Sequence, residues 1–146
     1  VAAGLILGAR EVGQKVLLGG GSQMLSVLAL ALSALGQESR SEFVDGIAIG
    51  TTSWLIKEIP SSLRTGNPLE LLMTSIGEHF GVELFGLNTG LHFHASKYQA
   101  LRDYELGYVK EGVGAGALAL LAQLQGATIN QLVQSCDSAM AKLLFD

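Results

Sequence analysis

The feature that most constrains the fold is a regular alternation of short apolar runs with longer helical segments. The apolar runs cover residues 15–18, 43–49 and 82–87, and the helix-like segments cover residues 23–35, 69–80, 96–105, 115–124 and 128–144. Continuously apolar strands that alternate with helices are typical of a parallel sheet with helices on both faces. The sequence therefore predicts a Rossmann-like, three-layer α/β fold, with residues 1–146 in a single domain.

Three local expectations follow from the same patterns. Residues 1–9 fit either the end of a helix or a buried strand, and residues 39–42 form a polar, exposed segment. Residues 23–35 are apolar nearly all round, which indicates a helix buried on every side.

The composition is unusually apolar. Hydrophobic residues make up 49% of the chain and charged residues 15%, whereas about 25% is usual for charged residues in a soluble domain. The two long uncharged segments, residues 16–37 and 112–136, are interrupted by glycines or by Gln and Asn. Neither offers the about 20 continuous apolar residues of a membrane-spanning helix, so we expect no membrane insertion. The net charge of −4 and the scattered Lys and Arg argue against nucleic-acid binding.

Gly19, Gly20 and Gly21 follow the first predicted strand, and Ser22 is a favourable N-cap for the helix behind them. Backbone N–H groups at such a helix start bind anions, with help from the helix dipole. The alternative is a tight turn that only glycine can adopt.

Asp45 and Gly46 lie among apolar residues at the expected end of the second strand. A carboxylate there binds ribose hydroxyls or caps a turn, and Gly46 allows close approach of a ligand or chain. Ligands of parallel α/β sheets bind at the carboxyl ends of the strands. We therefore expect the segments 19–23, 45–52 and 111–116 to meet at that edge.

The segment with the clearest chemical signal runs from residue 110 to residue 116, KEGVGAG, directly before an apolar helix. Glu111 is its only carboxylate, and a carboxylate in a dry site acts as a general base near neutral pH. The alternative is that Glu111 only stabilises the helix N-terminus through the dipole.

His92 and His94 alternate, so on a strand they share one face. No third ligand follows at a suitable spacing, and contact with a ligand or simple surface placement is favoured over a metal site. Cys136 is the only cysteine, which excludes a disulfide framework.

Two segments resemble the nicotinate-nucleotide:dimethylbenzimidazole phosphoribosyltransferase family. KEGVGAGALA, residues 110–119, is similar to the Gly-Glu-Gly-(Thr/Ser)-Gly-Ala helix start of that family. LLGGGSQMLSVLALALSAL followed by FVDGIAIGTT resembles its Gly-Gly helix segment and its Val-Asp-Gly-Phe strand. The run LRDYELGYVKEGVGAG is closest to the divergent archaeal and cyanobacterial branch. The resemblance covers most of the chain.

The resemblance implies a cytoplasmic, homodimeric enzyme of cobalamin lower-ligand synthesis that needs no metal or cofactor. Its substrates are nicotinate mononucleotide and an aromatic base, and Glu111 is the catalytic base. Gly112 and Gly114 belong to the same motif, in which Val113 replaces a hydroxyl residue. His94 or Ser96 takes the place of the phosphate-contacting serine of the family, within Leu91–Ser96.

The N-terminal half of that family, which holds the base, has no counterpart in these 146 residues. The resemblance therefore implies the C-terminal portion of a longer phosphoribosyltransferase-like protein that is inactive alone. Two alternatives remain: a nucleotide- or phosphate-binding module without catalysis, and a structural dimerisation domain that uses its Leu- and Ala-rich helices as an interface.

Overall fold

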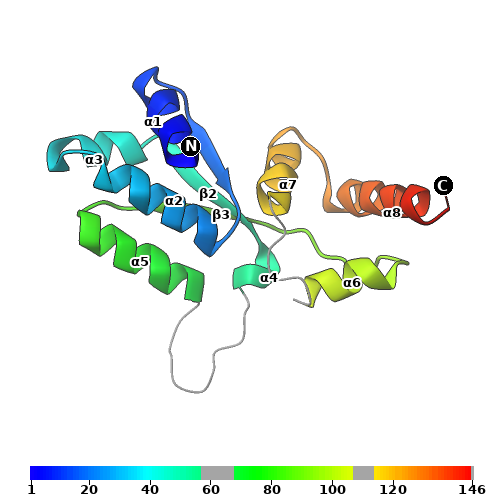
Figure 1. The fold of residues 1–146 in the computed structure, drawn as a ribbon. Coiled ribbons are helices and arrows are strands. Elements are labelled where there is room, and N and C mark those ends of the chain that lie inside the picture. The colour runs from blue at the N-terminus through cyan, green and yellow to red at the C-terminus, as the bar shows by residue number, and fades with distance from the viewer. Residues whose placement is uncertain (57–67, 107–113, 146) are drawn as a thin grey trace.

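The computed structural model describes residues 1–56, 68–106 and 114–145 (Figure 1). The strands are β1 Val16–Gly19, β2 Ile47–Thr52 and β3 Phe85–Thr89. The helices are α1 Ala2–Glu11, α2 Ser22–Ser33, α3 Gln37–Val44, α4 Ser53–Ile56, α5 Pro68–Phe80, α6 Gln99–Glu105, α7 Ala115–Leu124 and α8 Ile129–Phe145.

The strands form one parallel sheet in the order β1-β2-β3. Gly19 pairs with Gly50, and Thr52 pairs with Thr89. All strands point the same way, so they end together at what we call the carboxyl edge of the sheet. The opposite end is the amino edge.

One face of the sheet is sealed by α1, α2, α3 and α5. Alternation along the strands directs Leu18, Ile47 and Ile49 to this face, where they pack against buried leucines of α2. Burying side chains of this size contributes roughly 1.5–3 kcal/mol each. The first hydrophobic core therefore lies between this face and these helices.

On the other face, α7 packs onto the carboxyl half of the sheet through unusually close contacts. A Cβ on Gly50 would lie 3.1 Å from the Cα of Ala117, and one on Gly116 would lie 2.2 Å from the carbonyl carbon of Thr51. A side chain at Gly116 has no room, so glycine there allows the first turn of α7 to rest on the end of β2.

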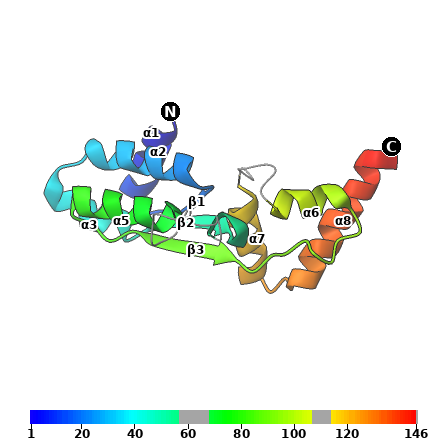
Figure 2. The same cartoon turned by 90° about the horizontal axis from the view of Figure 1, so that it is seen from below.

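A second core holds the chain that follows β3. Trp54 of α4 packs edge-on against Tyr104 of α6, with ring centroids 5.3 Å apart, and lies 5.8 Å from Phe93. Leu91 and Ala119 complete its buried part. Burial raises the pKa of Tyr104. Figure 2 shows α6 and α8 beyond α7, on the side away from the first core.

The structure confirms the α/β fold with a parallel sheet and most of the predicted elements. The predicted helix at 115–124 has the observed bounds of α7, and residues 2–9 belong to helix α1 rather than to a strand, with Val1 as the N-cap. The third strand begins at Phe85, three residues later than expected. The Pro, Ser, Gly and Asn residues of the segment 60–68 predict a loop; residues 60–67 of it lie outside the described residues, and Pro68 is the first residue of α5.

Three local predictions were wrong. The polar segment 39–42 is largely exposed, as expected, but Phe43 and Val44 do not begin a strand, because residues 39–44 all belong to helix α3 and these two are its buried side chains. Ser22 is not the N-cap of α2, because Gly21 takes that position and Ser22 is the first helical residue. Leu30 is 64% exposed, so α2 is buried on one side only.

We predict that Gly116→Ala destabilises the fold, because its methyl group would overlap the backbone of Thr51. The expected loss is about 1–3 kcal/mol in the free energy of unfolding, measured by urea titration. Gly8→Ala in α1 is the matched control. A Cβ there meets nothing within 4 Å, so it should gain about 0.5–1 kcal/mol of helix propensity. Equal stability of the two variants would contradict this account of α7 packing.

Candidate functional site

The N-termini of two helices, α2 and α7, lie close together at the carboxyl edge, and each has a glycine as its N-cap. Gly21 is the N-cap of α2, and Gly114, with a left-handed φ of 76°, is the N-cap of α7. A Cβ on Gly19 would lie only 3.1 Å from the Cα of Gly114. Helix N-termini carry unpaired N–H groups and the positive end of the helix dipole. The structure thus brings together Gly19, Gly21 and Gly114, as the sequence predicted.

Three threonines are buried at the ends of β2 and β3, and one of them is fully bonded. Thr89 donates its hydroxyl hydrogen to the side-chain oxygen of Gln123 and accepts a hydrogen bond of 3.2 Å from the Leu91 N–H. Its donor and an acceptor site are both used within the protein. Thr89 therefore has a structural role.

The hydroxyls of Thr51 and Thr52 differ from that of Thr89, because neither has a hydrogen-bond partner in the described part of the chain. Their residues are 3% and 1% exposed. An unpaired buried hydroxyl costs roughly 1–3 kcal/mol. Two neighbouring ones at one strand end are unusual, and the missing partner of such a hydroxyl is a water molecule, an ion or a ligand.

Successive side chains of a strand point to opposite faces of the sheet, so the hydroxyls of Thr51 and Thr52 lie on opposite faces. Thr51 continues the row of Ile47 and Ile49, which faces α2. Thr52 continues the row of Gly50, which faces α7. The Thr51 hydroxyl is therefore on the same face of the sheet as α2, and the Thr52 hydroxyl is on the same face as α7. Hydroxyl donors combined with helix-terminal N–H groups suit the oxygens of a phosphate or another oxyanion.

The sequence analysis placed the segment 45–52 at this edge but did not single out Thr51 and Thr52 as site residues. The only available signal was a pair of polar residues directly after a buried, apolar strand, where the sequence reads IAIGTTS.

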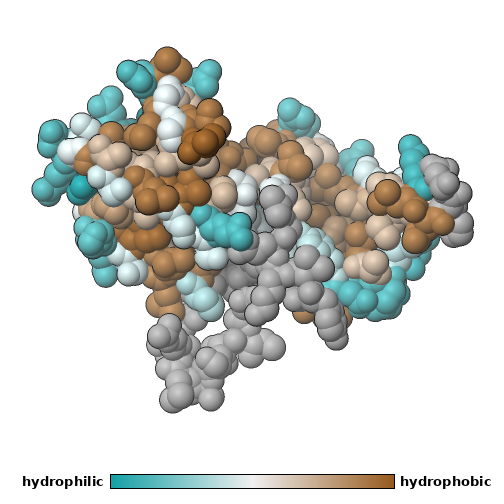
Figure 3. Space-filling view, viewed as in Figure 1, coloured by the Kyte–Doolittle hydropathy of each residue, from teal (hydrophilic) through white to brown (hydrophobic). Residues whose placement is uncertain are grey.

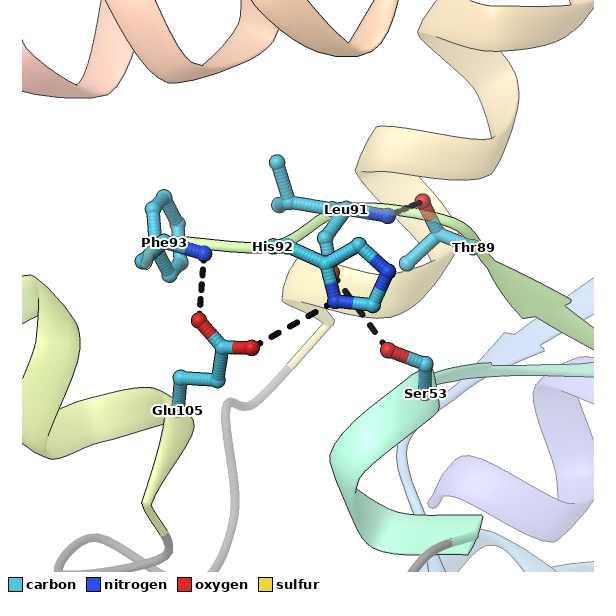
Figure 4. Close-up of polar contacts among 6 residues, drawn as sticks. All are labelled: Ser53, Thr89, Leu91, His92, Phe93 and Glu105. Atoms are coloured by element: carbon cyan, nitrogen blue, oxygen red, sulfur yellow. Dashed lines mark hydrogen bonds and ion pairs between the residues drawn. The ribbon is translucent and has the colours of Figure 1, made fainter. Parts of the chain in front are cut away.

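The chain after β3 is fixed close to this edge (Figure 4). Ser53, the residue after Thr52, donates a 3.4 Å hydrogen bond to the carbonyl of Leu91. The Glu105 carboxylate accepts from the Phe93 N–H at 2.5 Å and lies 3.4 Å from Nδ1 of His92. When His92 donates from Nδ1 to this carboxylate, its Nε2 is left as a hydrogen-bond acceptor.

His94 and Ser96 differ in solvent exposure and in hydrogen bonding. His94 is exposed, and its ring centroid lies 5.9 Å from that of His92. Ser96 is 3% exposed; its hydroxyl donates to Asp137 of α8 at 2.5 Å and accepts from the Tyr98 N–H at 3.1 Å. Ser96 therefore ties this segment to α8, and phosphate contact by either residue stays a prediction.

The predicted place of Asp45 and Gly46 was wrong. Asp45 is the exposed C-cap of α3, and Gly46 comes just before β2. Both lie at the amino edge, and Gly46 alone is about 13 Å along the strand from Gly50 at 3.3 Å per residue, so they cannot share a site with Gly19–Ser22. Gly46 is small for a packing reason, since a Cβ there would overlap the guanidinium of Arg10 at 2.1 Å.

Glu111 and Gly112 lie outside the described residues, and so does the rest of the segment 107–113. The described chain resumes at Gly114, at the carboxyl edge beside Gly19. The catalytic role of Glu111 therefore stays a prediction.

The described ranges offer neither a metal site nor a membrane-spanning helix. Within residues 1–56, 68–106 and 114–145, no three His, Cys, Asp or Glu side chains form a group able to hold a metal ion. Over the same ranges, every helix is too short or too polar to cross a membrane. Cys136 is half-buried on α8, and burial, followed by the charge of Asp137, raises its thiol pKa.

The chain is similar to UPF0284 proteins over nearly its whole length. It is 62% identical over 144 residues to one from Prochlorococcus marinus strain MIT 9313, and 51% identical over 146 residues to one from Parasynechococcus marenigrum strain WH8102. It is 38% identical over 143 residues to one from Aeropyrum pernix. These matches cover 97–99% of this chain but 35–36% of each relative. The chain thus spans about a third of the length of the curated relatives it matches. No protein-family model matches it.

We predict that Thr51→Val and Thr52→Val leave the free energy of unfolding unchanged or raise it by about 1 kcal/mol, because no internal hydrogen bond is lost. Thr89→Val, the matched control, should lower it by about 1–3 kcal/mol, because Gln123 and the Leu91 N–H lose their partner. Urea unfolding measures all three. If valine at 51 or 52 destabilises as much as valine at 89, these hydroxyls are bonded inside the protein and await no ligand.

Proposed function

We propose that this chain supplies the phosphoribose site and the catalytic carboxylate of a nicotinate-nucleotide:base phosphoribosyltransferase of cobalamin lower-ligand synthesis. One observation carries the proposal. The N-termini of α2 and α7 lie at the same edge of the sheet as the buried hydroxyls of Thr51 and Thr52, which lack partners among the described residues. Donors of this kind suit the phosphate of a mononucleotide.

The resemblance of residues 110–119 to the catalytic motif of that family adds the chemistry. Glu111 precedes Gly114 by three residues, and Gly114 lies at the carboxyl edge beside Gly19. A base bound there gives its N–H proton to the Glu111 carboxylate while its nitrogen attacks C1 of the ribose. The bond from C1 to the nicotinate nitrogen breaks, and nicotinate leaves with the bonding electrons.

The part of the enzyme that binds the base is proposed to lie in the larger share of the relatives that this chain does not span. By this proposal the 146 residues are one portion of a longer polypeptide, and the portion alone binds the mononucleotide without turning it over. A homodimer and a cytoplasmic location belong to the same proposal.

A phosphate-binding module without catalysis is the second candidate. It is favoured by the fact that the described donors at the carboxyl edge are hydroxyls and backbone N–H groups, which bind an anion without chemistry. The two candidates differ in what Glu111 does.

We predict saturable binding of nicotinate mononucleotide by this chain in calorimetric titration. Thr51→Val or Thr52→Val should weaken it about tenfold or more, because a hydrogen bond to a charged phosphate is worth about 1.5–3 kcal/mol and 1.4 kcal/mol is tenfold. Thr74→Val, at an exposed position of α5, is the matched control and should bind like the unmodified chain. Unchanged binding by both buried-threonine variants would exclude them from the phosphate site.

We predict that Glu111→Gln leaves this binding nearly intact, because the carboxylate acts on the base rather than on the phosphate. In a full-length UPF0284 polypeptide whose matched third is replaced by this chain, the same substitution should lower turnover by about 10² or more, the usual contribution of a positioned general base. Nucleotide binding without turnover in the unsubstituted full-length polypeptide would favour the non-catalytic module.

A further inference from the structure

No helix among the described residues covers the amino half of the sheet face that carries α7. There the floor of a groove of about 650 Å³ is formed by the strands, and α7 forms one wall. The groove is lined by apolar side chains from both: Leu17, Ala48, Phe85 and Leu87 from the strands, and Leu120, Leu121 and Leu124 from α7. We call it the amino-edge groove.

The apolar lining of this groove is open to solvent. Phe85 is 62% exposed, Leu121 45% and Leu124 76%. The opposite face of the same sheet is sealed, with Ile49 only 1% exposed. Parallel sheets are almost always covered on both faces, and a contiguous exposed apolar patch marks an interaction surface. Figure 3 also shows apolar side chains reaching the surface over α7.

The edges of the sheet are open as well. Among the described residues, β1 and β3 each pair only with β2. Phe85 and Gly86 of β3 are exposed. A sheet edge of this kind is normally paired or covered. The groove and the open edges together indicate that a layer of secondary structure belongs on this side of the molecule.

We propose that the amino-edge groove is the docking site of a helix from the part of UPF0284 polypeptides that lies outside the region matched by this chain. The relatives match nearly all of this chain, yet the match is only 35–36% of their length. Roughly two thirds of each relative therefore remains to supply the missing layer.

The charged residues at the rim of the groove indicate which side chains the docking helix should carry. Lys15, Asp45 and Glu83 stand around the apolar floor. The docking helix carries an apolar stripe that covers Phe85 and Leu121, flanked by a basic residue that faces the two carboxylates. This gives Asp45 a place at an internal interface rather than at the phosphate site.

The test compares the reactivity of engineered cysteines in this chain alone and within a full-length polypeptide. The full-length form is the Prochlorococcus marinus relative with its matched third replaced by this chain. In a Cys136→Ser background, Phe85→Cys and Leu121→Cys probe the groove. Ser138→Cys, exposed on α8, is the control. A soluble thiol reagent measures the labelling rate of each variant.

We expect the cysteines at 85 and 121 to react at least 100-fold more slowly in the full-length polypeptide than in this chain, while the cysteine at 138 reacts equally in both. Equal rates at 85 and 121 in the two forms would overturn the proposal. So would protection of these sites in this chain alone, together with a dimeric mass by light scattering, because a second copy would then be the occupant. Nucleotide binding enters neither outcome, so this test is independent of the proposed function.

Discussion

The close approach of α7 to the end of β2 is the contact on which the rest of the structure depends. Gly116 rests directly on the backbone of Thr51, and Gly50 leaves room for Ala117. Because neither glycine presents a side chain, the first turn of α7 reaches the carboxyl edge, where α2 also begins. The positive ends of two helix dipoles are thereby placed together beside a buried strand end. The close packing of two glycines against backbone is what makes an anion site possible here.

The two unusual features of the molecule lie on either side of this contact. At the carboxyl edge, α7 rests on the backbone of Thr51 and Thr52, whose buried hydroxyls find no partners within the described ranges, whereas Thr89 nearby is fully bonded. At the amino edge, α7 forms only one wall of the groove, and no other helix among the described residues covers this face of the sheet. Phe85 is exposed as a consequence. A strand end with two buried hydroxyls that lack described partners and an uncovered part of the sheet thus lie on either side of α7.

The sequence predicted the fold class and the meeting of Gly19 with Gly114, because periodicity and glycine runs are local signals. It misplaced Asp45, because two apolar residues such as Phe43 and Val44 have no period and fit a strand or a helix end equally well. It could not reveal Thr51 as unpartnered, because that depends on which groups surround a side chain in space. The catalytic role of Glu111 rests on resemblance and lies beyond the described residues.

The most direct test of the central claim is an amide NMR titration of this chain with ribose 5-phosphate, which carries the proposed recognition elements without the base. The account predicts saturable shifts of the Gly20, Gly21, Thr52 and Gly114 amides, with Gly46 at the amino edge unmoved. Shifts at Gly46 alone, or no saturable shift at the carboxyl edge, would contradict it.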